Sequence, residues 1–156
     1  MLKRYSSIDG NMPSCVSISN KATFKNSWIE MDEASAKITI GKDLIASNAH
    51  ISVKEGGELV IGNLCEVQGR IIVESGSKLI IGNGLVCNGD IRIQVAEKGM
   101  VYIGNDCLFA NPHILNSDMH SIYSTENNER INQARNITIG DRVWLATNSL
   151  ILKGTN

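Results

Sequence analysis

The sequence predicts an all-β protein whose chain winds into a parallel β-helix, and three observations support this fold class. An isoleucine–glycine pair recurs along the chain. Within the repeated units, apolar residues recur every six positions. Aromatic residues make up only 4% of the chain, so aliphatic and small side chains must fill the core. The repeated glycines are Gly41, Gly62, Gly82, Gly104 and Gly140.

The six-residue period separates this fold from other architectures. It fits neither an α-helix with 3.6 residues per turn nor a strand that alternates every second residue. It fits a chain that forms one short strand and one corner per six residues, so that three such units close a coil and successive coils pair in parallel. An irregular β-sandwich has no reason to keep this period through successive units. The residues expected to face the core are Ile61, Val67, Val73, Ile81, Cys87, Ile93, Ile103, Phe109, Ile139 and Leu145.

The glycine spacing indicates coils that are longer than three units of six residues. Successive glycines lie 62 − 41 = 21, 82 − 62 = 20 and 104 − 82 = 22 positions apart. Polar segments at 54–58, 74–78 and 96–99 contain glycine and are expected to hold the extra residues as turns. The whole chain, 1–156, is expected to form one β-helix domain, with residues 1–15 as an N-terminal cap.

Charge, hydropathy and cysteine content argue against several classes of function. The formal net charge is −1, with 15 basic and 16 acidic residues intermixed, so no nucleic-acid partner is expected. No apolar run approaches the roughly 18 residues that span a bilayer, and no secretory signal follows the charged start, so we expect a cytoplasmic protein without a transmembrane segment. Cys65, Cys87 and Cys107 fall at core-facing positions and are interpreted as small apolar residues.

A long polar segment interrupts the repeat after Leu115. The next core-facing residue is Ile139, 139 − 115 = 24 positions later where six would suffice, so 24 − 6 = 18 residues leave the helix. We expect a protruding active-site loop over residues 116–135, because binding and catalytic residues concentrate on loops that a rigid scaffold holds. This loop contains His120 two residues after Asp118.

Four segments at and after this loop form a specific combination. They are residues 116–123 (NSDMHSIY), 129–132 (ERIN), 139–145 (IGDRVWL) and 151–154 (ILKG). Together they resemble bacterial polysaccharide O-acetyltransferases of the hexapeptide-repeat class, most closely those that modify capsular sialic acid. The resemblance covers mainly residues 96–154. It implies a left-handed β-helix, a homotrimer with acetyl-CoA in grooves between neighbouring subunits, and further coils after Asn156.

The resemblance implies acetyl transfer from acetyl-CoA to a sugar hydroxyl of a capsular or surface polysaccharide. A sugar hydroxyl is a weak nucleophile near neutral pH, and a neutral imidazole can remove its proton as the oxygen attacks the thioester. His120 matches the catalytic histidine of the family. Trp144 matches a tryptophan that shapes the site, and Asp118 is a candidate to orient the imidazole. Trp144, Ala146 and Lys153 are candidates to contact acetyl-CoA, and no metal is expected.

Two alternatives remain open at this point. The chain can be a binding or scaffold protein, a β-helix trimer that keeps the fold without catalysing a reaction. It can also be compared with γ-class carbonic anhydrases, which share the fold and need three histidines around zinc. His50, His113 and His120 are separated by 113 − 50 = 63 and 120 − 113 = 7 positions, which does not match the closely grouped ligands of that class.

Overall fold

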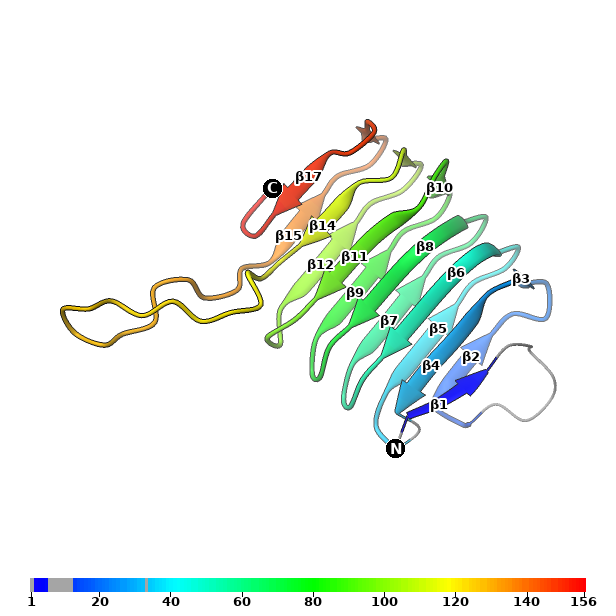
Figure 1. The fold of residues 1–156 in the computed structure, drawn as a ribbon. Coiled ribbons are helices and arrows are strands. Elements are labelled where there is room, and N and C mark those ends of the chain that lie inside the picture. The colour runs from blue at the N-terminus through cyan, green and yellow to red at the C-terminus, as the bar shows by residue number, and fades with distance from the viewer. Residues whose placement is uncertain (1, 6–12, 33) are drawn as a thin grey trace.

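The computed structural model describes residues 2–5, 13–32 and 34–156, which wind into a parallel β-helix with three faces per coil (Figure 1). Each coil passes through face 1, face 2 and face 3 in turn, and strands of successive coils pair in parallel. One strand, β1 (Leu2–Tyr5), instead pairs antiparallel with β4 at the N-terminal end. Residues 6–12 of the expected N-terminal cap lie outside the described residues. The described ranges contain no helix that could span a membrane.

Face 1 is the most regular of the three faces. Its strands are β2 (Val16–Ile18), β5 (Lys37–Ile40), β7 (Glu58–Ile61), β9 (Lys78–Ile81), β12 (Met100–Ile103) and β15 (Ile137–Ile139). Each strand turns alternate aliphatic side chains inward, as Leu79 and Ile81 of β9 do. Their stacking on equivalent residues of the next coil removes apolar surface from water along the whole helix axis.

Faces 2 and 3 share two long strands, β6 (Ile45–Val53) and β8 (Glu66–Val73), which run through the corner between them. The remaining strands of face 2 are β3 (Thr23–Lys25), β10 (Val86–Cys87), β13 (Leu108–Phe109) and β16 (Trp144–Leu145), and those of face 3 are β4 (Trp28–Asp32), β11 (Ile91–Val95), β14 (His113–Leu115) and β17 (Leu150–Leu152). Face 3 is turned toward the viewer in Figure 1.

The structure confirms the predicted fold class and core. Nine of the ten residues expected to face the core are buried, and Leu145, in the coil nearest the C-terminal end, is half-buried against the same core. Cys65, Cys87 and Cys107 are also buried within it. Burial raises the pKa of the Cys87 thiol to about 12, so this side chain is a neutral core residue at physiological pH.

The corner between faces 2 and 3 accounts for the uneven coil lengths. Equivalent positions on its two sides are 46 and 49, 67 and 69, and 87 and 91, which are three, two and four positions apart. These corner lengths of three, two and four positions belong to the coils with glycine spacings of 21, 20 and 22 residues, so the corner length accounts for the difference between the coils. The polar segments form turns as predicted, but these turns have one length in all three coils, so the differences between the spacings arise at the corner between faces 2 and 3. Val73 therefore stacks on Val95, while Ile93 stacks on Ile71.

A ladder of side-chain amides closes the corner between faces 1 and 2. The Oδ1 atom of Asn83 accepts a hydrogen bond from the backbone N–H of Asn63 at 2.8 Å, and that of Asn105 accepts one from Asn83 at 2.9 Å. Asp141 continues the ladder and accepts from the backbone N–H of Asn105 at 2.6 Å and from its side-chain amide at 3.0 Å. These bonds lower the pKa of the Asp141 carboxyl. Each ladder residue thus satisfies a backbone donor of the preceding coil.

Replacing Ile81 with Asp is expected to prevent folding, because a carboxylate would be buried between aliphatic neighbours of two coils without a partner. The matched control is Ile80→Asp, one position along the same strand, where the side chain points outward and is half-exposed. Circular dichroism during thermal unfolding checks both variants. A soluble Ile81→Asp protein with a cooperative transition would contradict the proposed packing.

Replacing Asn83 with Ala is expected to lower the free energy of unfolding by about 1–2 kcal/mol, because the ladder loses bonds in both directions. Asn88→Ala is the control, since this exposed asparagine lies at the other end of β10, outside the ladder. Urea denaturation of the two variants measures the difference, and equal stabilities would show that the ladder contributes nothing.

Candidate active site

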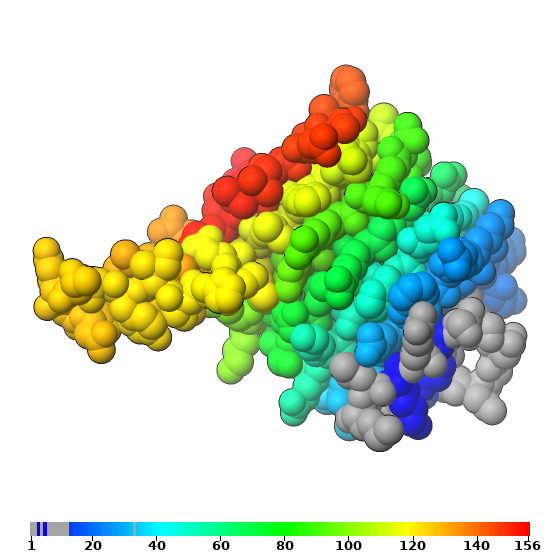
Figure 2. All heavy atoms as spheres, in the orientation of Figure 1, coloured from blue at the N-terminus to red at the C-terminus, as the bar shows by residue number. Residues whose placement is uncertain are grey.

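The loop leaves the β-helix at the corner between faces 3 and 1. Continuing the strand pairing, Asn116 is equivalent to Val95 and Arg135 is equivalent to Gly99. The chain therefore takes 135 − 116 = 19 positions where the preceding coil takes 99 − 95 = 4, so 15 additional residues form the loop. It extends from the body as a single arm (Figures 1 and 2).

The two sides of the loop form a short antiparallel ribbon. The N–H of Ile131 donates to the carbonyl of Ile122 at 2.9 Å, and that of Ser124 donates to the carbonyl of Glu129 at 2.8 Å. The backbone groups of the two sides therefore pair with one another along the arm. Its position relative to the body is set at the base.

Asn116 fixes the point of departure. Its side chain is fully buried at an inward position where the other coils have apolar residues. The side-chain oxygen accepts a hydrogen bond from the N–H of Ala96 at 2.7 Å, and the side-chain amide donates to the carbonyl of Ala96 at 3.0 Å. The side-chain oxygen of Asn116 therefore takes the place of the backbone carbonyl that accepts this hydrogen bond in the preceding coil, where the N–H of Glu74 donates to the carbonyl of Val95.

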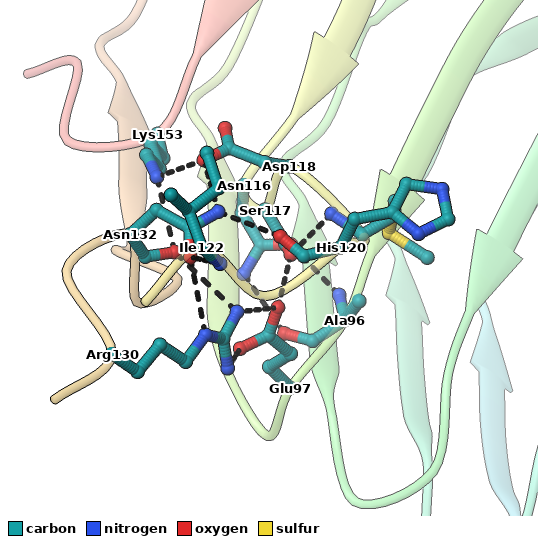
Figure 3. A network of polar contacts seen from close by, with 11 residues as sticks. Ala96, Glu97, Asn116, Ser117, Asp118, His120, Ile122, Arg130, Asn132 and Lys153 are labelled. Carbon is teal, nitrogen blue, oxygen red and sulfur yellow. Dashed lines mark hydrogen bonds and ion pairs between the residues drawn. The ribbon is translucent and has the colours of Figure 1, made fainter. Parts of the chain in front are cut away.

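Glu97 and Arg130 clamp the two sides of the base together (Figure 3). The guanidinium forms a bidentate ion pair with the carboxylate, at 2.5 and 2.8 Å. The hydroxyl of Ser117 donates a short hydrogen bond to the same carboxylate. These contacts, that of Arg130 first, hold the pKa of Glu97 at about 2, well below its ordinary value of 4.5.

Asn132 ties together the residues around His120. Its side-chain amide donates to the main-chain carbonyl of His120 at 2.7 Å and to Asp118 at 2.9 Å, and its side-chain oxygen accepts from the N–H of Ile122 at 2.6 Å. Lys153 forms a short ion pair with Asp118, which lowers the pKa of that carboxyl. Through these bonds one buried amide fixes the backbone on both sides of the histidine.

His120 presents a free face to solvent while its backbone is held. The residue is exposed, and its imidazole points away from the Asp118–Lys153–Asn132 cluster and toward the side of the body (Figure 3). The preceding residue, Met119, has φ = 64°, a left-handed conformation that is unfavourable for a residue other than glycine. Asp118 thus contacts Lys153 and Asn132 in this structure, and its expected role as the orienting partner of the imidazole stays a prediction.

The structure places the other predicted site residues at separate points around the triangular cross-section that the three faces form. Trp144 lies on the outer surface of face 2 in β16 and exposes 71% of its surface. Ala146 is exposed in the corner that follows, between faces 2 and 3. Lys153 lies at the corner between faces 3 and 1, beside Asp118. That corner is opposite face 2, so one chain does not bring His120 and Trp144 together.

The three histidines lie apart as well. His50 lies on β6, where its ring packs against Trp28 with 4.8 Å between ring centroids. His113 lies on β14 and His120 on the loop. Within the described ranges, no group of three or more histidine, cysteine or acidic side chains is arranged to hold a metal ion. His50, His113 and His120 of one chain therefore do not converge on a common point where they could bind zinc.

Sequence reasoning did not place Glu97, Arg130 or Asn132 at the base of the loop, which they hold together. The available signal was the segment 129–132, which carries part of the resemblance. Glu97 has no such signal, because it lies 33 positions before its partner and within an ordinary turn.

Comparison with known proteins agrees with this architecture. The chain is 52% identical over 67 residues to a polysialic acid O-acetyltransferase of Neisseria meningitidis, and the match spans 42% of this chain and 31% of the relative. It is 43% identical over 61 residues to a polysialic acid O-acetyltransferase of Escherichia coli O1:K1 / APEC, a match that spans 38% of this chain and 20% of the relative. The chain thus aligns with less than one third of each of these relatives. No family model matches the chain.

Two crystal structures share the fold over 89% of this chain. The polysialic acid O-acetyltransferase OatWY superposes with a TM-score of 0.66 at 31% identity, and 67% of its chain is covered. The polySia-specific acetyltransferase NeuO superposes with a TM-score of 0.54 at 24% identity, with 65% of its chain covered. The hand of the helix expected from the resemblance agrees with these neighbours. The chain therefore belongs to the polysialic acid O-acetyltransferase family of left-handed parallel β-helix proteins.

Proposed function

We propose that the protein to which this chain belongs transfers an acetyl group from acetyl-CoA to a hydroxyl of a sialic-acid polymer. The observation that carries the proposal is His120, an exposed imidazole on an arm whose base is fixed by a polar network. Family relatives named for the same reaction support it. Because acetyl-CoA is a cytoplasmic metabolite, we place the reaction in the cytoplasm.

In the proposed reaction, His120 acts as the general base. A ring nitrogen takes the proton of the sugar hydroxyl while the oxygen forms a bond to the thioester carbonyl carbon. The tetrahedral intermediate then breaks its carbon–sulfur bond, and the imidazolium returns the proton to the departing thiolate. The hydrogen bond from Asn132 to the carbonyl of His120 holds the base in place without occupying its ring. This leaves both ring nitrogens available to the reaction.

The positions of His120 and Trp144 support a site shared between copies of the chain. The loop leaves the corner opposite face 2, whereas Trp144 stands exposed on face 2. Ile45, Val86 and Leu108 lie in the same outward column of that face and are also exposed, with Glu66 between Ile45 and Val86. A homotrimer would place the arm of one copy against face 2 of the next. Trp144 and Ala146 of one copy would then line the acetyl-CoA groove together with Lys153 of the copy that supplies the arm.

Replacing His120 with Ala is expected to lower kcat for acetyl transfer to polysialic acid by roughly 10²- to 10⁴-fold, the range of general acid–base catalysis. The KM for acetyl-CoA should stay nearly unchanged, because the imidazole acts on the transition state. Ser121→Ala is the matched control, since this neighbouring loop residue is also exposed. If the His120→Ala enzyme kept more than about a tenth of the wild-type kcat, a residue other than His120 would be the general base. Absence of any transfer by the wild-type protein would favour the binding role.

The clamp of Glu97 and Arg130 is expected to open at low pH. Since the pKa of Glu97 is lowered from 4.5 to about 2 in the folded protein, its contribution is fully present above pH 4.5 and is lost as the pH falls toward 2. Glu97→Gln should therefore loosen the loop already at neutral pH. Hydrogen exchange of the amides of residues 117–132 measures this, and kcat should fall more than the affinity for acetyl-CoA.

The control for the clamp is Glu55→Gln. Glu55 occupies the position of Glu97 two coils earlier, in an exposed turn without a loop. The control should leave exchange in residues 117–132 unchanged. Equal exchange in the wild-type protein and Glu97→Gln would show that the ion pair does not hold the arm.

A further inference from the structure

A column of basic and aromatic side chains crosses the outer surface of face 3. The strand register places Trp28, His50, Arg70, Arg92 and His113 one above the next, on β4, β6, β8, β11 and β14. Neighbouring strands lie about 4.8 Å apart, so the side chains recur at this interval along the helix axis. Both arginines are exposed. The column is therefore a linear array that the solenoid imposes, although the chain as a whole carries a net charge of −1.

A groove of about 360 Å³ runs beside this column. Its floor includes Ser52 and Ile72, which point outward yet expose only 6% and 8% of their surface. The basic column forms one wall. Lys54 and Glu74, joined by an ion pair at 2.6 Å, belong to the other wall. The floor and walls follow positions two residues apart along each coil, with Lys54 and Glu74 directly after the ends of β6 and β8, so the groove runs parallel to the helix axis.

Arg70 and Arg92 are the two strongly basic groups of this groove that have no acidic partner among the described residues. Lys54 pairs with Glu74, and the carboxylate of Glu30 lies 3.4 Å from His50, a contact that is an ion pair only when the imidazole is protonated. Within the part of the chain that the structure describes, neither arginine forms an ion pair. The two guanidinium groups occupy directly paired positions of adjacent strands, where like charges repel each other. An anion bound between them would remove that repulsion.

We propose that this groove binds the anionic acceptor polymer along the helix axis, with sugar carboxylates at Arg70 and Arg92. The guanidinium group pairs with carboxylates through two parallel hydrogen bonds, which suits it to this ligand. A polymer that bears one carboxylate per sugar presents charges in a row, as the column does. The inference rests on the proposed function, because the polymer is the acceptor in that reaction.

The groove leads to the catalytic arm. Gln94, at one end of the groove, is paired in register with Leu115 of β14. The loop begins directly after Leu115, and the imidazole of His120 points toward the body (Figure 3). A polymer lying in the groove would thus continue toward the base. The groove would hold the polymer while its successive sugars reach His120.

The test is the binding of fluorescently labelled polysialic acid, followed by fluorescence anisotropy, to the full 156-residue chain and its variants. Arg70→Ala/Arg92→Ala is expected to weaken binding at least tenfold, and Arg70→Lys/Arg92→Lys should retain most of it. Lys21→Ala/Lys42→Ala is the matched control, because it removes two exposed positive charges from the corner between faces 1 and 2. The control should bind within twofold of the wild-type protein.

Two binding results would overturn the proposal. The first is equal binding by the arginine double variant and the lysine control, which would show that face 3 does not hold the polymer. The second is single-stranded DNA of matched length binding as tightly through the same arginines, which would show a site for polyanions in general. Unlabelled neutral dextran should not compete.

Acetyl transfer separates this proposal from the proposed function. With a short sialic acid acceptor that cannot span the groove, the arginine double variant should match the wild-type kcat, while KM for the polymer rises at least tenfold. If the KM of the arginine double variant for the polymer equalled that of the wild-type protein, the groove would not be the polymer-binding site, and the proposed reaction would be unaffected. Binding that depends on the arginines, with no acetyl transfer to any acceptor, would refute the reaction and support the groove.

Discussion

The stacking of inward side chains from coil to coil is the constraint on which the rest of this structure depends. The inward side chains of each coil fill the narrow interior between the three faces. Leu79 and Ile81 must therefore stack on their equivalents in the coils above and below. A residue added within a strand would turn that strand's apolar side chains outward. Extra residues are therefore accommodated at corners, and the variable corner between faces 2 and 3 shows this directly.

The functional arm follows from the same constraint. Fifteen additional residues can leave the helix only if the backbone donors and acceptors at the point of departure find other partners. The buried amide of Asn116 supplies them, and the polar contacts of Glu97, Arg130 and Asn132 then fix the direction of the arm. A polar network outside the apolar core can therefore set the position of His120 without disturbing the stacking.

The three sides of the triangle present different chemistry. Face 2 carries a column of exposed side chains that is mostly apolar, is interrupted by Glu66 and ends at Trp144, and the opposite corner carries the arm with His120. Face 3 carries the basic column and the groove. Each outward position recurs once per coil. Residues at equivalent positions, although about 20 positions apart in the sequence, therefore form a continuous row on the surface. The solenoid thus arranges individual side chains into elongated surfaces that can bind an elongated partner, either a second copy of the chain or a polymer.

The sequence by itself determined the fold class, nine buried core residues and the place of the loop, since a six-residue period and its interruption are local properties of the chain. It did not determine which inward residues stack, because Val73 and Ile93 hold the same place in the period but not in the register. The hand of the helix came from resemblance, since the spacing is the same for either hand. Contacts such as that of Asp118 with Lys153 join residues 35 positions apart, and only the closing of the next coil brings them together.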